Sequence, residues 1–209
     1  MKERIDNRMR ERQPLLPALV EHVETEYERV RALLAAGAAV ESGPVTHHGR
    51  RYERIISGHD RTNPEHTSVR LRDLDTGEVT NVTSAEELLF WRWAAMEVLR
   101  LSGIRIEELV ELSQLSIRQY RRAGGEVIAL LVIAPSKTDR ERVIPMSAEL
   151  FHVIAQIVKR HTAGGRAIPL VHRYDDNERV WIDEPMPYLF SAASAVCSKS
   201  SEEPPSWTG

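Results

Sequence analysis

Residues 101–112, LSGIRIEELVEL, are the segment that indicates the fold of this chain most directly. Gly103 interrupts an apolar helical pattern, and the pattern restarts directly behind Arg105. Glu108 follows three residues after that arginine, which brings it back to the same side after about one helical turn. The segment therefore predicts a helix, then a glycine turn, then a new helix that begins at an arginine.

A strand, a turn and a second strand are expected behind this segment. Residues 126–134, EVIALLVIA, form an apolar run of strand length, and residues 142–146, RVIPM, form a shorter one. Lys137 and Arg140 lie between the two runs, so the pattern predicts a two-stranded hairpin with a lysine at its tip. Ser147 precedes a further helical pattern and is expected to cap that helix.

The preceding part of the chain predicts two long helices with strands between them. Residues 15–36 carry apolar side chains at helical spacing opposite a charged face. From 45 to 83 the apolar period shortens to that of strands. Residues 84–87, SAEE, fit a capping box that opens a helix to about Leu101, with Leu88 on its buried stripe. The expected class is α+β, mostly helical with small antiparallel β-hairpins.

Composition limits the classes of function. The 209 residues are 42% apolar, which suits one globular domain of ordinary size. The net charge of −3 and a pI near 6.3 lack the strongly basic balance typical of nucleic-acid binders, although charge can be segregated to one face. A single cysteine, Cys197, excludes an intrachain disulfide or a cysteine-based zinc site. No apolar run is long enough to cross a membrane, so we expect a cytoplasmic protein with no membrane partner.

The order of these features resembles the first half of the catalytic domain of the tyrosine recombinases, the phage-integrase family. The resemblance covers about residues 15–190 and is most specific between 97 and 150. It implies site-specific DNA recombination, in which a tyrosine attacks a phosphodiester and neither a metal nor another cofactor takes part. The implied partner is double-stranded DNA, and the family also allows a homo-oligomer assembled on that DNA.

The resemblance assigns roles to five side chains. Arg105 corresponds to the first of two catalytic arginines, whose planar guanidinium can donate two parallel bonds to the phosphate oxygens. Lys137 corresponds to the hairpin lysine, which can act as general acid toward the departing 5′-oxygen. Glu108 would orient the helix that Arg105 begins. Arg140 and Arg142 are candidate DNA-binding residues on the hairpin.

The second half of the family's site is not found. The family has a His-x-x-Arg box behind the hairpin helix and then a nucleophilic tyrosine. None of the histidines behind Lys137 has an arginine three residues later, and Tyr188 fits a packing aromatic. We therefore expect residues 1–190 to be a partial, truncated catalytic domain, inactive by itself, with a β insertion at about 45–83. Residues 191–209 are rich in serine, alanine and proline and are expected to be a disordered tail.

Two other classes of function stay open. A helix-turn-helix regulator would have helices at 106–113 and 117–122, the second of them basic. Val110 and Gln114 fit that motif poorly, since it favours a small residue and a glycine at these positions. An interaction fragment without a DNA role would suit the acidic balance. Salt dependence separates the classes, because phosphate contacts make DNA affinity fall steeply with salt.

Overall fold

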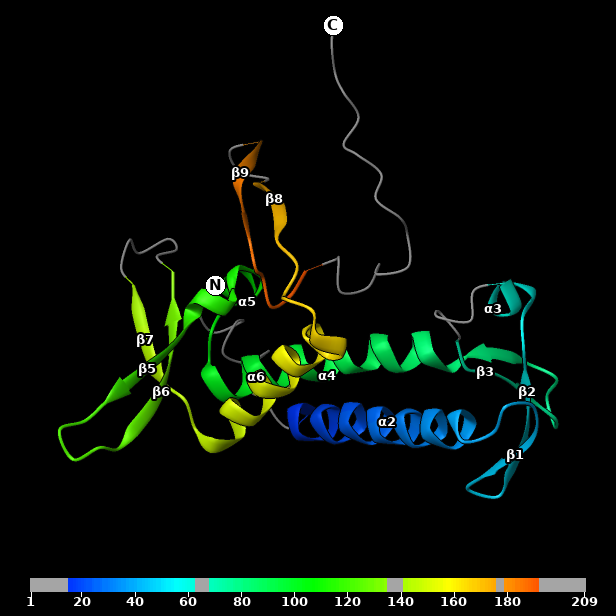
Figure 1. Cartoon of the computed structure of the whole chain (residues 1–209). Coiled ribbons are helices and arrows are strands. Elements are labelled where there is room, and N and C mark those ends of the chain that lie inside the picture. Colours follow the sequence, from blue (N-terminus) through cyan, green and yellow to red (C-terminus); the bar gives the residue numbers. More distant parts are fainter. Residues whose placement is uncertain (1–14, 63–67, 135–140, 176–178, 192–209) are drawn as a thin grey trace, which may run out of the picture. The chain divides into compact units, whose positions relative to one another are not determined.

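The computed structural model describes residues 15–62, 68–134, 141–175 and 179–191. These residues form α-helices and three small antiparallel sheets (Figure 1), which confirms the mixed α and β class with small antiparallel hairpins. The chain divides into two compact units. The first contains residues 1–105 and 147–154, and the second contains residues 106–146 and 155–209.

Two long helices, α2 (Leu15–Ala38) and α4 (Val82–Ser102), pack together in the first unit. Aromatic rings fill their contact. The ring of Tyr27 stacks on Trp93 with centroids 5.3 Å apart and meets Phe90 edge-on at 5.9 Å. Such arrangements stabilise a contact beyond the area that the rings bury. The rings therefore hold the two helices side by side.

The ends of α4 have well-defined caps. The side-chain oxygen of Asn81 accepts a hydrogen bond from the Ser84 backbone N–H at 3.2 Å, so Asn81 is the N-cap and the predicted cap, Ser84, lies inside the first turn. Gly103 has a φ of 66°, and its N–H donates to the Leu99 carbonyl to end the helix as predicted. The prediction that Leu88 is buried is wrong, because its side of α4 is exposed.

A four-stranded antiparallel sheet lies between these helices in the sequence, at residues 43–81. Its strands pair in chain order: β1 (Gly43–His47), β2 (Arg50–Ile55), β3 (Arg70–Asp73) and β4 (Val79–Asn81). A short helix, α3 (Gly58–Thr62), follows β2. The inner face carries Val45, Tyr52 and Leu71, which are buried in one cluster with Val30 and Leu33 of α2. Neither β1 nor α3 was predicted from the sequence.

Arg54 fastens this sheet to α2. Its guanidinium donates to the carbonyl oxygen of Gly37 at 3.0 Å and also to that of Val40. The last turn of α2 has no basic residue of its own. A cation at a helix C-terminus satisfies unpaired carbonyls and interacts favourably with the helix dipole, so β2 supplies the cap that α2 lacks.

The contact between α2 and the sheet is tightest at Gly37. A Cβ at this position would lie 2.6 Å from Cγ1 of Val69 and 3.4 Å from Cδ2 of Leu71. Alanine favours a helix by about 1 kcal/mol over glycine, but overpacking costs about 1–3 kcal/mol, and a β-branched valine moves little. We therefore expect Gly37→Ala to lower the free energy of unfolding by about 1–2 kcal/mol in urea titrations.

Gly124→Ala is the matched control, because a Cβ there meets no atom within 4 Å and its φ is not positive. This variant should unfold like the wild type. A Gly37→Ala protein that is more stable than wild type would show that the contact relaxes without cost.

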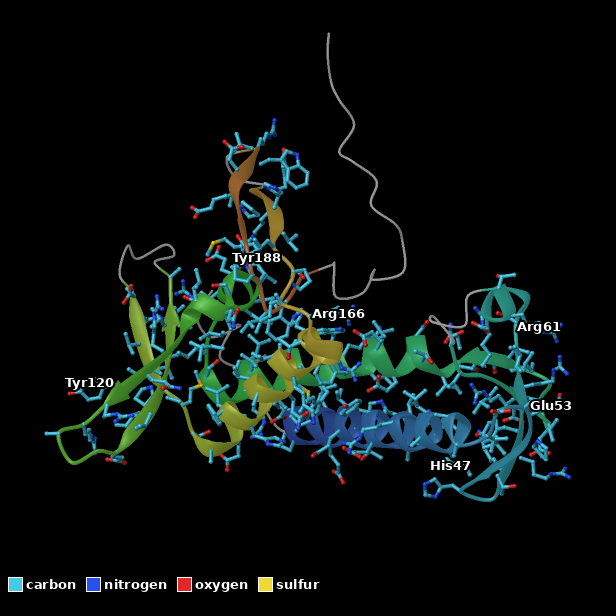
Figure 2. The ribbon with its side chains drawn as sticks, viewed as in Figure 1. His47, Glu53, Arg61, Tyr120, Arg166 and Tyr188 are labelled. Carbon is cyan, nitrogen blue, oxygen red and sulfur yellow. The ribbon has the colours of Figure 1, made fainter. Side chains whose placement is uncertain are left out.

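The second unit contains a three-stranded antiparallel sheet. Helix α5 (Ile106–Glu111) and the 3-10 turn η2 (Gln114–Ser116) lead into β5 (Ile117–Arg121), which pairs with β6 (Val127–Ile133), and β6 pairs with β7 (Arg142–Pro145). The predicted hairpin of β6 and β7 is thus extended by a third strand. Tyr120 projects from β5 (Figure 2) and is exposed.

Strand β5 occupies the residues at which the regulator alternative expects its second helix. That expected helix over 117–122 is wrong. Ile117 lies directly opposite the fully buried Leu131 of β6, and the strand continues as far as the pair Arg121 and Val127. The backbone N–H and C=O groups of this polar segment form hydrogen bonds with the apolar strand β6, so they do not need the hydrogen bonds of a helix.

Helix α6 (Ala148–His161) follows β7 and is capped as predicted, since Ser147 Oγ accepts a hydrogen bond from Leu150 N–H at 3.1 Å. The turn η3 (Ala163–Gly165) and a hairpin of β8 (Val171–Asp175) and β9 (Val180–Met186) complete the second unit. This hairpin was not predicted.

The segment behind β9 is anchored on the chain beyond α5. Tyr188 forms an antiparallel bridge with Ser113, and Leu189 N–H donates to the Leu112 carbonyl at 2.8 Å. A ring nitrogen of His161, Nε2, lies 3.0 Å from the Leu189 carbonyl oxygen. Tyr188 and Leu189 are both buried, which confirms the prediction that Tyr188 is a packing aromatic.

Candidate functional site

Arg105 occupies the loop that separates α4 from α5. The left-handed conformation of Gly103 turns the chain there, and the buried side chain of Ile104 fixes the loop. Arg105 itself is exposed and directly precedes α5. The predicted order of helix, glycine turn, arginine and new helix is present, with Arg105 as an exposed residue directly before α5.

Glu108 points into the protein from α5. It is 3% exposed, and one of its carboxylate oxygens accepts a hydrogen bond from the Arg142 guanidinium at 2.5 Å. A buried carboxylate needs a cation or hydrogen-bond donors to offset the loss of water. The structure therefore brings together Glu108 and Arg142, to which the sequence assigned separate roles. Their ion pair links α5 to β7.

Arg142 lies on β7, opposite Ile133 of β6. Its side chain is 48% exposed although one nitrogen binds Glu108. The guanidinium is thus oriented by a buried partner while part of it stays accessible. Its assignment as a phosphate contact stays a prediction.

The two remaining candidates, Lys137 and Arg140, lie outside the described residues. The chain that contains them joins β6 to β7, whose last pair before the connection is Ile133 with Arg142. The pairing of these two strands is as predicted, and the position of Lys137 between them stays a prediction.

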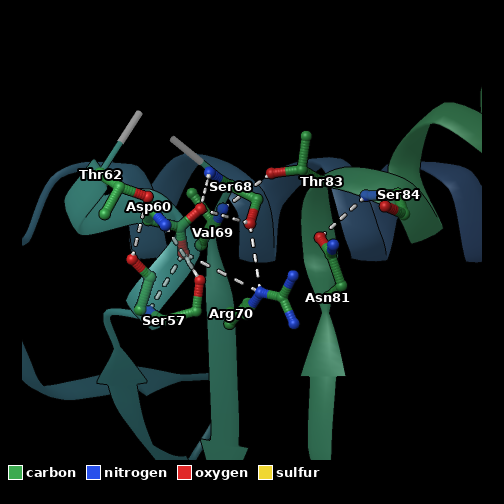
Figure 3. A network of polar contacts seen from close by, with 10 residues as sticks. Ser57, Asp60, Thr62, Ser68, Val69, Arg70, Asn81, Thr83 and Ser84 are labelled. Atoms are coloured by element: carbon green, nitrogen blue, oxygen red, sulfur yellow. Dashed lines mark hydrogen bonds and ion pairs between the residues drawn. The ribbon is translucent and has the colours of Figure 1, made fainter. Parts of the chain in front are cut away.

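The first unit contains a polar cluster that sequence reasoning missed. The buried carboxylate of Asp60 accepts hydrogen bonds from the backbone N–H and the hydroxyl of Ser57, at 3.1 and 2.6 Å, and from the same two groups of Ser68, both at 3.2 Å (Figure 3). Ser57 Oγ in turn accepts from Asp60 N–H at 3.2 Å, which completes a capping box for α3. The Ser-x-x-Asp spacing at 57–60 is the signal that could have revealed it.

The cluster stabilises the ionised form of Asp60. Hydrogen bonds from the Ser57 hydroxyl, and then from Ser68 and the Ser57 backbone, outweigh burial and lower the pKa of Asp60 from 3.8 to about 2. Arg70 adds a longer contact, with its Nε 3.9 Å from Oδ2 of Asp60. A fixed anion therefore lies beside the start of β3.

No group of three or more His, Cys, Asp or Glu side chains in the described part of the chain is arranged to hold a metal ion. Among the same residues, none of the helices has the length and apolar character needed to cross a bilayer.

Comparison with known proteins finds no family model, no curated protein and no solved structure that matches this chain.

Proposed function

We propose that this chain contains the first part of a tyrosine recombinase catalytic domain and that it binds double-stranded DNA. The observation that carries the proposal is the ion pair between Glu108 and Arg142. It joins the helix that follows Arg105 to the strand that follows the Lys137 segment through one partly buried contact. The order of α4, Arg105, α5, three antiparallel strands and α6 supports the same proposal.

The proposed chemistry uses each side chain for one task. Arg105 would donate two parallel hydrogen bonds to the phosphate oxygens, where negative charge develops in the transition state. Lys137 would supply a proton to the departing 5′-oxygen. Glu108 would bind Arg142 and thereby fix the position of α5 relative to β7, without touching DNA.

Strand cleavage would need two further groups. The sequence has no His-x-x-Arg box behind Lys137, and Tyr188 is buried against Ser113. A second arginine and a nucleophilic tyrosine would therefore have to come from outside these 209 residues. Loss of the nucleophile abolishes covalent catalysis rather than weakening it, so we propose DNA binding without cleavage for this chain alone.

The proposal predicts salt-dependent binding to a labelled DNA duplex in fluorescence anisotropy. Each phosphate contact contributes about −0.9 to the slope of log affinity against log salt, so Arg105→Gln should make the slope shallower by about 0.9. The matched control is Arg31→Gln, which removes an exposed arginine of α2 that is paired with Glu28. Its slope should equal that of the wild type. Absence of any salt-dependent binding by the wild type would sink the proposal.

A second candidate function is protein binding without a DNA role, and the hairpin of β8 and β9 favours it. Trp181 is 64% exposed and meets Tyr174 edge-on with ring centroids 5.4 Å apart, while Val180 is exposed beside it. Clustered exposed apolar side chains mark interaction surfaces. The same titration separates the two candidates, because a chain with only this function would not bind the duplex at any salt concentration.

A further inference from the structure

The outer face of the four-stranded sheet gathers arginines. Because side chains alternate along a strand, Val69 and Leu71 point inward, whereas Arg70 and Arg72 point outward. Arg51 of β2 shares their face. The described outward positions of the ladder are Pro44, Thr46, Arg51, Glu53, Ile55, Arg70, Arg72, Val79 and Asn81. Three of these side chains are cationic and one is anionic, although the chain as a whole is acidic.

The side chain of Arg70 is held in place by contacts to its Nε. Its Nε donates to the Ser68 hydroxyl at 3.2 Å and lies 3.9 Å from Oδ2 of Asp60, whose side chain is 1% exposed (Figure 3). Ser68 and Ser57 hold Asp60 in turn. Among the described residues, both contacts of Arg70 are made by Nε and neither uses a terminal nitrogen. The side chain is 37% exposed, so its two terminal nitrogens lie at the solvent end of a fixed group.

This geometry suits a phosphate group. A guanidinium whose Nε is fixed presents its remaining N–H groups in one plane, and that fork matches two oxygens of a phosphate. Fixing the side chain beforehand also lowers the entropy lost on binding. The charge of Asp60 is already stabilised by four hydrogen bonds from Ser57 and Ser68, so it does not require the terminal nitrogens of Arg70.

Arg51 and Arg72 extend this cationic face on either side of Glu53. Arg72 pairs with Glu53 at 3.1 Å, and Arg51 pairs with Asp75 at 3.4 Å. Both arginines are exposed, and exposed ion pairs contribute only about 0–1 kcal/mol. A polyanion that brings several phosphates at once can therefore compete for both guanidinium groups. Arg61 of α3, the short helix that follows β2, is exposed as well; Figure 2 labels it together with Glu53.

We propose that the outer face of the sheet of β1 to β4 contacts the phosphate backbone of duplex DNA, with Arg70 as its fixed phosphate ligand. This inference rests on the proposed DNA-binding function and adds a second surface to it. It also assigns a role to the β insertion at 45–83, which is longer than the recombinase resemblance leads us to expect. Because backbone phosphates carry no sequence information, the contact is independent of base sequence.

Anisotropy titrations of the full chain over a salt series, with two duplexes of unrelated sequence, test this surface. Arg70→Gln should weaken binding to both duplexes about five- to tenfold and make the salt slope shallower by about 0.9. Arg70→Lys keeps the charge but not the fork, so it should keep the slope and lose part of the affinity. Arg31→Gln again serves as the matched control.

The outcomes distinguish this inference from the function on which it rests. Salt-dependent binding by the wild type that is unchanged in Arg70→Gln would overturn the surface and leave the proposed function standing. No binding by the wild type would overturn both. Urea unfolding checks that Arg70→Gln is folded. If it is not, the double variant Arg51→Gln, Arg72→Gln gives the same test, with an expected change in slope of about 1.8.

Discussion

Replacing Asp60 with alanine is expected to lower the free energy of unfolding by about 3–5 kcal/mol. The variant loses four hydrogen bonds and leaves the backbone N–H groups of Ser57 and Ser68 without their acceptor. Each buried donor left without a partner costs about 1–3 kcal/mol. Urea titration at neutral pH measures the loss, and Asp75→Ala is the control because that carboxylate in the same sheet module is exposed.

The free energy of unfolding measured at several pH values separates the contribution of the Asp60 charge from that of the packing of its side chain. The Ser57 hydroxyl, followed by the other serine donors, lowers the pKa of Asp60 from 3.8 to about 2, below its value in the unfolded chain. The resulting stability is therefore fully present above about pH 5 and is lost as the pH falls through about 2. The two pKa values correspond to about 2 kcal/mol. The wild type should lose this amount on acidification, whereas Asp60→Ala should show no such component.

The long helices of this fold could be predicted because their apolar residues repeat over many turns. The patterns at 15–36 and behind Ser147 correspond to α2 and α6. The strands β1 and β5 could not be predicted in the same way. Pro44 and Gly43 indicate the end of a helix, yet the same residues begin β1. Ile117 is the one residue of β5 that is even partly buried, so the strand depends on pairing with β6 rather than on its own apolar pattern.

The candidate site shows the same division between local and distant contacts. The turn before Arg105 follows from Gly103, which is a local signal. The partner of Glu108 is 34 residues away, and no local pattern relates it to Arg142. Asp60 and Ser57 are near neighbours with a recognisable spacing, but the second serine of the cluster, Ser68, is reached only because β3 returns beside α3. Sequence reasoning therefore identified Glu108 and Arg142 but not the contact between them, and it missed the cluster around Asp60.

Arg142→Ala is expected to lower the free energy of unfolding by about 3–5 kcal/mol, since it leaves the buried carboxylate of Glu108 without this cation. The matched control is Arg122→Ala, in the turn that joins β5 to β6. Arg122 pairs with Glu126 at 2.9 Å, but both side chains are more than 60% exposed, at 61% and 62%. Water replaces the lost partner there, so the control should cost less than about 1 kcal/mol. Urea titration of the two variants measures the difference.

Glu108→Leu in the Arg142→Ala background tests whether the buried charge is the cause. Replacing a buried ion pair by apolar side chains is often neutral, so the double variant should recover most of the stability that Arg142→Ala loses. Equal, small losses in Arg142→Ala and Arg122→Ala would show that Glu108 needs no cation. The ion pair would then no longer connect α5 to β7 energetically, and the proposed function would lose the observation that carries it.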